Sequence, residues 1–240
     1  MSETAEAGGA AAVKTLCIDI GGTGIKAIVL DAAGKPLTER ARVLTPKPAT
    51  PRAVFRVIAE LARAQGDFDR VSVGFPGVVR RGVTGAAFNL SPRWAGVKVD
   101  RELSRLLRKR VRAANDADVQ GLGVVRRRGV ELVITLGTGF GSALFLDGRL
   151  VPNMQLAHHL GWRARTYEEE LGDRALRKVG KKKWNKRLLD AIRSLEKLFN
   201  YDALYIGGGN ARMIAVPLPA RVKIVSNEAG LFGGMALWRD

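Results

Sequence analysis

Short apolar runs bounded by glycine and proline predict β-strands in the first third of the chain. Residues 15–20 (TLCIDI) end at a pair of glycines, and residues 25–31 (IKAIVLD) follow directly. Residues 37–43 (LTERARV) alternate apolar and polar positions, which is typical of a half-exposed strand. Residues 70–75 (RVSVGF) end at a Pro-Gly pair. We therefore expect four strands before residue 76.

Helical periodicity appears in two segments. Thr50 can cap a helix and Pro51 suits a first turn, and apolar residues then recur at helical spacing, so we expect a helix over 51–64. Residues 101–112 repeat this pattern, with Asp100 as the expected cap and the basic side chains on the face opposite the leucines.

An internal repeat organises these elements. Residues 20–31 (IGGTGIKAIVLD) align with residues 136–147 (LGTGFGSALFLD) at an offset of 116, and four positions are identical. Both copies are predicted to be a strand, a glycine turn and a second strand. The repeat therefore predicts a duplicated α/β fold with two related halves.

Each half has a glycine-rich turn between its two strands. The first runs from Asp19 through Gly21, Gly22 and Thr23, and the second contains Thr138 and Gly139. Bare backbone N–H groups in such turns suit phosphate oxygens, and Asp19 can hold a water of a hydrated Mg²⁺. Neither turn is a Walker loop or a dinucleotide fingerprint, because no Gly-Lys-Ser/Thr and no helix follows. The alternative is a pair of plain hairpin turns.

Composition narrows the class of protein. The 240 residues suffice for one large or two small domains, and one cysteine, Cys17, excludes an intrachain disulfide and a cysteine-based zinc cluster. We expect a cytoplasmic protein, since no apolar run could cross a membrane and the N-terminus carries acids where a signal peptide needs bases. Residues 1–14 are expected to be a disordered lead-in.

The net charge of +17 points to a polyanionic partner. Most of it lies in three segments, 101–112, 126–128 and 163–187. Nucleic acid, an anionic membrane and phosphate-rich substrates are the candidate partners. Solvated helix faces are the alternative.

Several motifs resemble the sugar-kinase/actin-like superfamily and, within it, the ROK family. These are DIGGT near the N-terminus, TLGTGFGS at the second turn, FPG at 75–77 and NDAD at 115–118. LCIDIGGTGIKA, TPKPATP, DGRLVPN and NEAGLFGG are similar to the polyphosphate glucokinase branch. The resemblance covers about residues 15–237.

This resemblance implies an α/β, duplicated actin-like (ribonuclease H-like) fold of two lobes with a cleft between them. We expect an N-terminal lobe over 15–114, a C-terminal lobe over 115–226, and a C-terminal helix near 227–238 that packs back on the first lobe. It also implies that Asp116 is the general base of a hexose kinase, although a turn or capping aspartate is the alternative.

Further roles follow from the same resemblance. Asn89, Asn115, Gln155 and His158 are candidates for binding the sugar. The turn after the predicted strand ALYI, residues Gly207, Gly208 and Gly209, is a candidate for the nucleotide side. Lys26 is counted with the phosphate-binding residues. For His158 and for the glycine turn, a purely structural role is the alternative.

The chain departs from the family pattern after the second turn. The family segment reads E-x-G-H-x-E, whereas this chain has Gln155 and Leu160 in place of the two acids. Glutamine can still form hydrogen bonds, but leucine cannot, so either weaker hexose binding or another acceptor is implied. The cysteine-rich zinc motif of many members is also missing, so we expect Mg²⁺ with the donor and no zinc.

The sequence thus favours a homodimeric hexose kinase that uses polyphosphate, ATP or both. The alternative is a catalytically weakened binding or sensor protein with this fold. A DNA-binding regulator is disfavoured, because only about 18 residues precede Asp19. We further predict that a basic helix face tracks polyphosphate, and that Arg187 points partly outward with it; the lysines of this track are Lys181, Lys182, Lys183 and Lys186.

Overall fold

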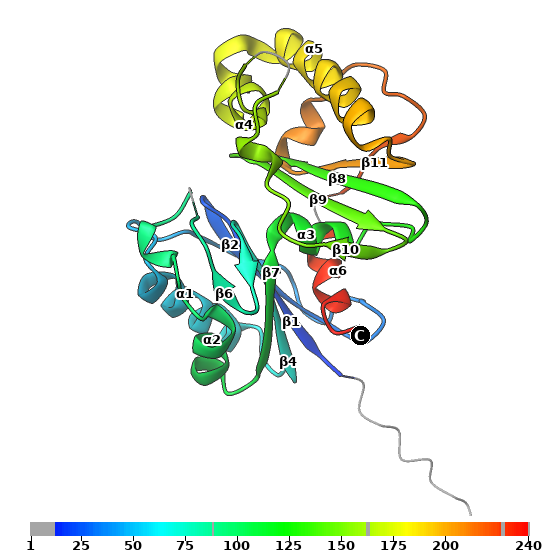
Figure 1. Cartoon of the computed structure of the whole chain (residues 1–240). Helices are drawn as coiled ribbons and strands as arrows, with labels where there is room; N and C mark the ends of the chain where they lie inside the picture. The colour runs from blue at the N-terminus through cyan, green and yellow to red at the C-terminus, as the bar shows by residue number, and fades with distance from the viewer. Residues whose placement is uncertain (1–12, 88, 162–163, 227–228, 240) are drawn as a thin grey trace, which may run out of the picture.

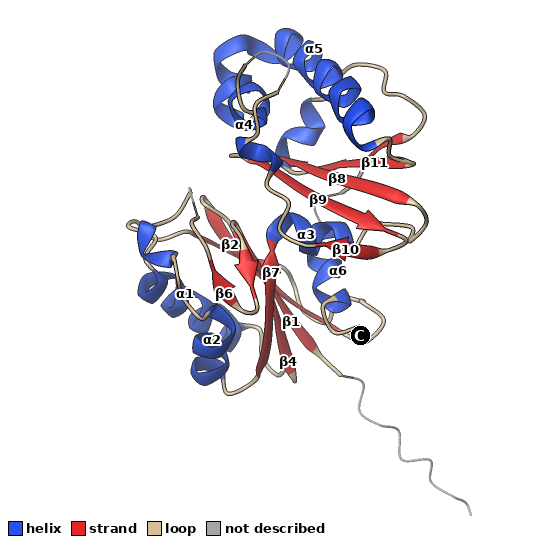
Figure 2. Ribbon diagram, in the orientation of Figure 1, coloured by secondary structure: helices blue, strands red, loops and turns tan. Residues whose placement is uncertain are grey.

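Two five-stranded sheets with helices on their faces form two lobes in this computed structural model of the chain (Figures 1 and 2). The structure describes residues 13–87, 89–161, 164–226 and 229–239; of the expected lead-in, residues 1–12 lie outside them. The strands are β1 Thr15–Ile20, β2 Gly24–Leu30, β3 Ala41–Leu44, β4 Arg70–Phe75, β5 Val79–Arg80, β6 Val83–Thr84, β7 Arg110–Asn115, β8 Val130–Leu136, β9 Phe140–Leu146, β10 Arg149–Val151, β11 Ala203–Gly207 and β12 Val222–Ile224. The helices are α1 Pro51–Ala64, α2 Val99–Leu107, α3 Asp116–Leu122, α4 Tyr167–Leu171, α5 Asp173–Phe199 and α6 Ala229–Ala236, with short 3₁₀ helices η1 Pro92–Trp94, η2 Leu156–His158 and η3 Gly209–Met213.

The two sheets have the same connectivity. The first has the order β3-β2-β1-β4-β7 and the second the order β10-β9-β8-β11-β12. In each, the opening hairpin is antiparallel, and its first strand, β1 or β8, pairs in parallel with a later strand, β4 or β11. The strands β2 and β9 begin and end 116 residues apart, as the repeat predicts. The predicted duplicated actin-like fold is therefore confirmed.

The strands β1 and β8 are central and almost wholly buried. A central strand of a sheet that is covered on both faces loses water from both rows of side chains, so its sequence is a continuous apolar run. This explains why the first strand was readable from the sequence. The helix α1 was also predicted correctly from 51 to 64, and the Thr50 side chain accepts a hydrogen bond from the Ala53 N–H.

Helices separate the sheets and cover their outer faces. Figure 1 shows α1 and α2 on the outer side of the first sheet, α4 and α5 on the outer side of the second, and α3 and α6 between the sheets. The helices α3 and α6 touch so closely that a Cβ added at Gly233 would lie 1.6 Å from the Val119 carbonyl oxygen. The Ser72 hydroxyl of β4 donates to the Gly234 carbonyl at 2.6 Å. The helix α6 thus packs against both α3 and the first sheet.

The predicted strand over 37–43 is wrong in its extent. The Thr38 hydroxyl accepts the Val29 N–H at 3.0 Å and also bonds to the Gln65 side chain. A side chain therefore occupies the pairing position on β2, and strand pairing resumes only in β3.

The predicted helix over 101–112 is wrong at both ends. Lys98, not Asp100, is the cap residue of α2, and Asp100 lies in the first turn. The helix ends at Leu107, the following residue Arg108 has a left-handed φ of 54°, and the chain continues as β7 in parallel with β4. Only Leu103 of the predicted leucine face is buried in α2. A helical period over so few turns does not exclude a strand in its last residues.

The long helix α5 buries an apolar face but is not one straight helix. Trp184, Leu188 and Ile192 are at most 1% exposed. Gly180 has a φ of 75°, so the helix bends there. Among the described residues, no helix is both long and apolar enough to cross a bilayer.

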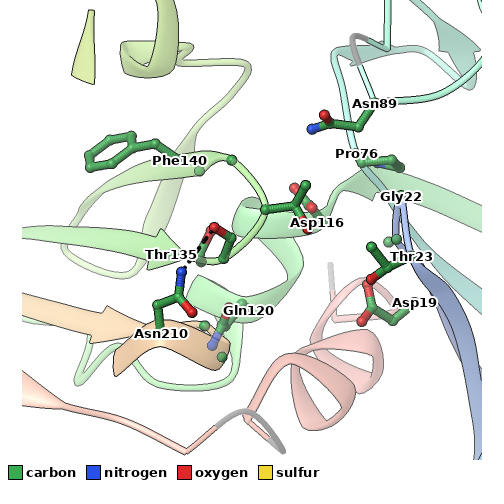
Figure 3. Close-up of a pocket in the computed structure, with 18 of the residues that line it drawn as sticks. Asp19, Gly22, Thr23, Pro76, Asn89, Asp116, Gln120, Thr135, Phe140 and Asn210 are labelled. Atoms are coloured by element: carbon green, nitrogen blue, oxygen red, sulfur yellow. Dashed lines mark hydrogen bonds between the residues drawn. The ribbon is translucent and has the colours of Figure 1, made fainter. Parts of the chain in front are cut away.

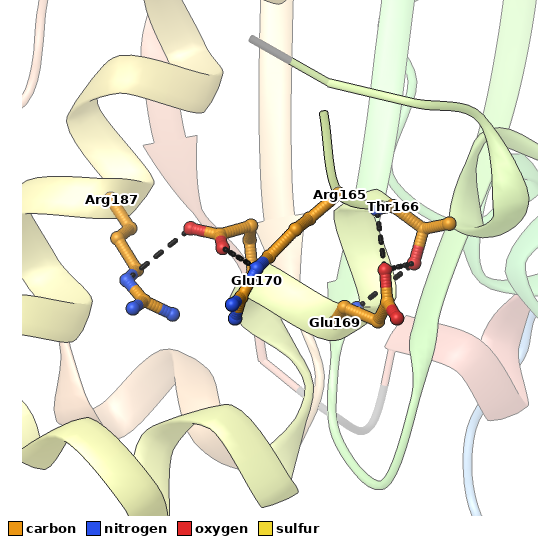
Figure 4. A network of polar contacts seen from close by, with 5 residues as sticks. All are labelled: Arg165, Thr166, Glu169, Glu170 and Arg187. Atoms are coloured by element: carbon orange, nitrogen blue, oxygen red, sulfur yellow. Dashed lines mark hydrogen bonds and ion pairs between the residues drawn. The ribbon is translucent and has the colours of Figure 1, made fainter. Parts of the chain in front are cut away.

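Arg187 does not point outward as predicted. Its Nε lies 3.3 Å from Oε2 of Glu170, which is 1% exposed, and the Arg165 Nε lies 3.9 Å from Oε1 (Figure 4). A buried carboxylate needs a charged partner, so Glu170 draws Arg187 inward and fastens α4 to α5.

Candidate active site

A cleft of about 1160 Å³ lies between the two lobes and contains the motifs singled out from the sequence. Both glycine turns, the start of α3 and the segment that leads into η2 line it. Figure 3 shows Asp116 between Gly22 and Thr23 on one side and Thr135 and Phe140 on the other. Segments separated by more than 100 residues therefore face one another across a single space.

The first glycine turn is held by its own backbone and by β3. The Gly21 N–H donates to the Gly24 carbonyl at 3.0 Å, and the Thr45 hydroxyl donates to the Gly21 carbonyl at 2.5 Å. Next to the turn, the Lys26 Nζ and the Asp19 Oδ2 form an ion pair at 2.7 Å, with both side chains about one-third exposed. The predicted Lys26 and Asp19 therefore neutralise each other in the cleft.

The second glycine turn is fixed by the starts of α5 and η3. The Gly137 carbonyl accepts hydrogen bonds from the Asp173 N–H at 2.9 Å and from the Asn210 side chain at 3.2 Å. A Cβ added at Gly137 would meet nothing within 4 Å. The turn therefore presents open space in front of its backbone, which a hairpin turn packed on protein would not. Thr138 and Gly139 also line the cleft.

Asp116 opens α3 at the point where β7 ends. The Asn115 Oδ1 caps the helix by accepting the Ala117 N–H at 2.9 Å and the Asp118 N–H at 3.2 Å. The pKa of the Asp116 carboxyl is raised to about 7, mainly by burial and then by the negative charges of Asp19 and Asp118, against a backbone hydrogen bond from Ala117 that lowers it. A carboxyl with this pKa is suited to accept a proton near neutral pH.

All four predicted sugar-side residues, Asn89, Asn115, Gln155 and His158, line the cleft. Leu160 is 61% exposed and does not line it. Leu160, which stands at the position of the second family acid, therefore lies outside the site.

Sequence reasoning missed Glu168, a carboxylate that lines the same cleft. Its Oε2 accepts the Phe140 N–H at 3.3 Å, and a Cβ on Gly139 would lie 2.4 Å from that oxygen. The sequence TYEEE does not indicate this position, because three consecutive acids are typical of the first turn of a helix, where they are favourable. Thr166 and Glu169 form the capping box of α4 (Figure 4), which leaves Glu168 as the acid of this turn in the cleft.

Of the three glycines predicted for the nucleotide side, Gly208 and Gly209 line the cleft, whereas Gly207 ends β11 behind the Gln120 side chain. Arg177 and Arg212 also line it, and sequence reasoning did not single them out. The four lysines of the predicted track are exposed on α5 but are not among the lining residues.

Among the described residues, no three His, Cys, Asp or Glu side chains gather into a metal cluster. The carboxylates of the cleft nevertheless interact, because Asp19 and Asp118 both raise the pKa of Asp116.

Comparisons with known proteins agree with this arrangement. Residues 15–172 match the model of the ROK family. The chain is 33% identical to a polyphosphate glucokinase of Mycobacterium tuberculosis, over 90% of this chain and 88% of that protein.

Solved structures extend the comparison to the whole fold. An inorganic polyphosphate/ATP-glucomannokinase from Arthrobacter sp. strain KM superposes with a TM-score of 0.85 at 34% identity, covering 93% of this chain and 97% of that one. A ROK family glucokinase from Streptomyces griseus, in complex with glucose and AMPPNP, shares the fold with a TM-score of 0.76 at 19% identity, covering 93% and 98%. Because the family model spans more than half of the chain and the sequence relative covers nearly all of it, this chain belongs to the ROK family.

Proposed function

We propose that this protein is a hexose kinase that transfers a phosphoryl group from polyphosphate or ATP to a hexose such as glucose. The observation that carries the proposal is the carboxyl of Asp116, half-buried between two glycine turns in one cleft and with its pKa raised to about 7. The names of the relatives, a polyphosphate glucokinase and a polyphosphate/ATP-glucomannokinase, support the same donors and acceptor class.

In this mechanism Asp116 accepts the proton of the sugar hydroxyl as the hydroxyl oxygen attacks the terminal phosphorus of the donor. The bond from that phosphorus to the bridging oxygen breaks, and ADP or a polyphosphate shorter by one phosphate leaves. The glycine turns hold the phosphoryl oxygens with backbone N–H groups. Phosphoryl transfer needs mainly positioning and neutralisation of charge, so one carboxylate beside the nucleophile and two amide cradles are sufficient machinery.

The residues present fit a Mg²⁺ ion that arrives with the donor. Mg²⁺ in such sites is held by one or two carboxylates together with phosphate oxygens and water, and Asp19 supplies a carboxylate at the edge of the first turn. Such an ion would neutralise phosphate charge. Lys26, paired with Asp19, keeps that carboxylate in place.

For the sugar, we propose hydrogen bonds from Asn89, Gln155 and His158 and a carboxylate acceptor in Glu168. The Asn115 amide has one N–H left for a sugar hydroxyl, because its oxygen caps α3 and its nitrogen also donates to the Gly77 carbonyl at 3.1 Å. Glu168 restores a charge-assisted acceptor to a site in which glutamine replaces the first family acid.

A glucose 6-phosphate assay with ATP and with long-chain polyphosphate tests the proposal. Turnover with either donor is expected. Glucose binding without turnover would instead support the alternative of a sugar or polyphosphate sensor, which Gln155 and Leu160 motivate. We further propose that the protein is cytoplasmic and that it forms a homodimer. Sedimentation equilibrium would test the dimer.

The proposed polyphosphate track begins at the cleft. Arg177 and Arg212 line the cleft, and the Asn185 side chain donates both to the Lys181 carbonyl at 2.9 Å and to the Met213 carbonyl at 3.0 Å. The first lysine of the track therefore lies beside the residue that follows Arg212. A nucleotide ends within the cleft, whereas a long polyanion would continue along this basic face.

The triple variant Lys181/Lys182/Lys183→Glu should lose polyphosphate use selectively. We expect its KM for polyphosphate to rise by about tenfold or more and its dependence on salt to become shallower, because fewer counterions are released on binding. Its KM for ATP should stay within about twofold of the wild-type value. Steady-state kinetics with both donors across a salt series measures this.

The matched control is Arg126/Arg127/Arg128→Glu, which reverses three adjacent exposed charges outside the cleft. Equal losses in the two triple variants would mean that only the net charge matters. No loss in either would leave the lysines of α5 as a solvated helix face.

A further inference from the structure

Hydrogen bonds join three segments beside the cleft into a ring, which the backbone of residues 77–79 closes. The Asn115 side chain donates to the Gly77 carbonyl at 3.1 Å and accepts the Asp118 N–H at 3.2 Å. The Asn153 backbone N–H faces the Asp118 carboxyl, and hydrogen bonding to it lowers the pKa of that carboxyl. The Asn153 Oδ1 in turn accepts the Val79 N–H at 3.2 Å. The ring thus connects the loop after β4, the start of α3 and the turn after β10.

One bond of this ring crosses between the lobes. Val79 follows the strand β4 of the first sheet, and Asn153 follows the strand β10 of the second. Asn153 has a φ of 64°, a left-handed conformation that asparagine adopts more readily than most residues. This backbone directs its N–H to Asp118 while its side chain reaches Val79. One residue therefore touches both α3 and the opposite lobe.

Asp118 is the buried end of the ring. It is 2% exposed, and its Oδ1 has no hydrogen-bond partner in the described part of the chain. Burial raises its pKa to about 7, and the hydrogen bond from Asn153 acts against that rise. Burial of a carboxyl costs free energy, and the hydrogen bond from Asn153 offsets part of that cost. The contact with Asn153 therefore gives Asp118 a role in positioning.

The segment that leaves the ring carries two of the proposed sugar ligands. Gln155 and His158 follow Asn153 within five residues. On either side of Gln155, the Ser142 hydroxyl donates to the Met154 carbonyl and accepts the Leu156 N–H, both at 3.1 Å. The segment is therefore fixed at its start by the ring and in its middle by β9.

We propose that Asn153 and Asp118 are positioning residues that hold the sugar-side segment 153–158 against the base-bearing turn and the opposite lobe. The proposal rests on the proposed function for the identity of the sugar site. Neither residue touches the reacting atoms. Loss of the ring should therefore weaken hexose binding more than it slows the chemical step.

The variant Asn153→Gly removes one bond of the ring and little else. Glycine adopts the same left-handed backbone and keeps the N–H that Asp118 accepts. The Val79 amide should then exchange its hydrogen faster, and the KM and the dissociation constant for glucose should rise about three- to tenfold, the range expected for one hydrogen bond. The KM for the phosphoryl donor and kcat should stay within about twofold.

The matched control is Asn200→Gly, the same change in the same backbone region at the end of α5, outside the cleft. It should leave glucose affinity and Val79 exchange unaltered. Asp118→Ala should raise the glucose KM at least as much as Asn153→Gly, and Asp118→Asn, which keeps an acceptor oxygen, should restore most of the affinity.

Hydrogen exchange by mass spectrometry, together with glucose titration by calorimetry, separates the two levels of the proposal. Unchanged Val79 exchange and unchanged glucose affinity in Asn153→Gly would overturn it, as would an equal rise in the donor KM. If the wild-type protein does not bind glucose, the acceptor of the proposed function is wrong. The Val79 exchange in Asn153→Gly then tests the ring by itself: faster exchange supports it and unchanged exchange overturns it.

Discussion

Replacing Asp116 by asparagine should lower kcat by at least about 100-fold, with the fold intact. Asparagine keeps the shape of the side chain but cannot take the proton of the attacking hydroxyl. Its effect should fall on kcat with both donors, since the base acts on the acceptor whichever phosphate chain supplies the phosphoryl group. Single-turnover kinetics with glucose and each donor measures the chemical step directly.

The pH dependence gives this prediction a second readout. The pKa of Asp116 is about 7, so the wild-type kcat/KM for the hexose should fall about tenfold per unit below pH 7 and level off above it. The residual activity of Asp116→Asn should lack that limb. An exposed acid, Asp67, provides the control Asp67→Asn, which should retain both the rate and the limb.

The same shift predicts an effect on stability. A carboxyl whose pKa rises from 3.8 in the unfolded chain to about 7 in the folded one loses stabilisation as pH rises between these values. Asparagine does not ionise. Asp116→Asn should therefore melt at a higher temperature than wild type above pH 7, and the two curves should converge near pH 4. A lower melting temperature at pH 8 would contradict the assigned burial cost.

Replacing Gly137 by valine should raise the KM for the donor by at least about tenfold, which corresponds to about 1.4 kcal/mol of binding free energy. An added Cβ there meets no protein atom within 4 Å, so the new side chain enters the space in front of the turn, where phosphate oxygens must approach the backbone. Folding should be unaffected. Donor titration by calorimetry and thermal melting measure the two effects.

Gly137 is a sharper test than the other glycines of the turns. A Cβ at Gly22 would lie 3.0 Å from the Asn89 Cβ, and one at Gly139 would lie 2.4 Å from the Glu168 carboxylate, so variants there would disturb proposed sugar ligands as well. Gly161→Val, outside the cleft and with only ordinary contacts, is the control. Normal donor affinity in Gly137→Val would show that the second turn is a hairpin turn without a phosphate role.

The duplicated fold could be predicted because its signals are local. The largely apolar sequence of β1 and the repeated strand-turn-strand pattern at an offset of 116 both follow from burial of the central hairpins. The helix α1 has its own cap and apolar face, so its ends were also correct. The errors fell where a tertiary contact overrides local preference, as when the Thr38 hydroxyl takes a pairing position on β2.

The candidate site also combines features that local sequence indicates with features that only tertiary contacts decide. The sequence by itself predicted the two halves and the two glycine turns, because each is encoded in adjacent residues, and the NDAD motif singled out Asp116 as the candidate base. Only the tertiary structure brought Glu168 and Arg177 into the cleft, turned Leu160 out of it and drew Arg187 inward to the buried Glu170. Runs of like residues such as TYEEE and RKVGKKK carry no local signal of which member faces the cleft. That choice depends on how the helices α4 and α5 pack on the second sheet, and on where each desolvated charge finds a partner.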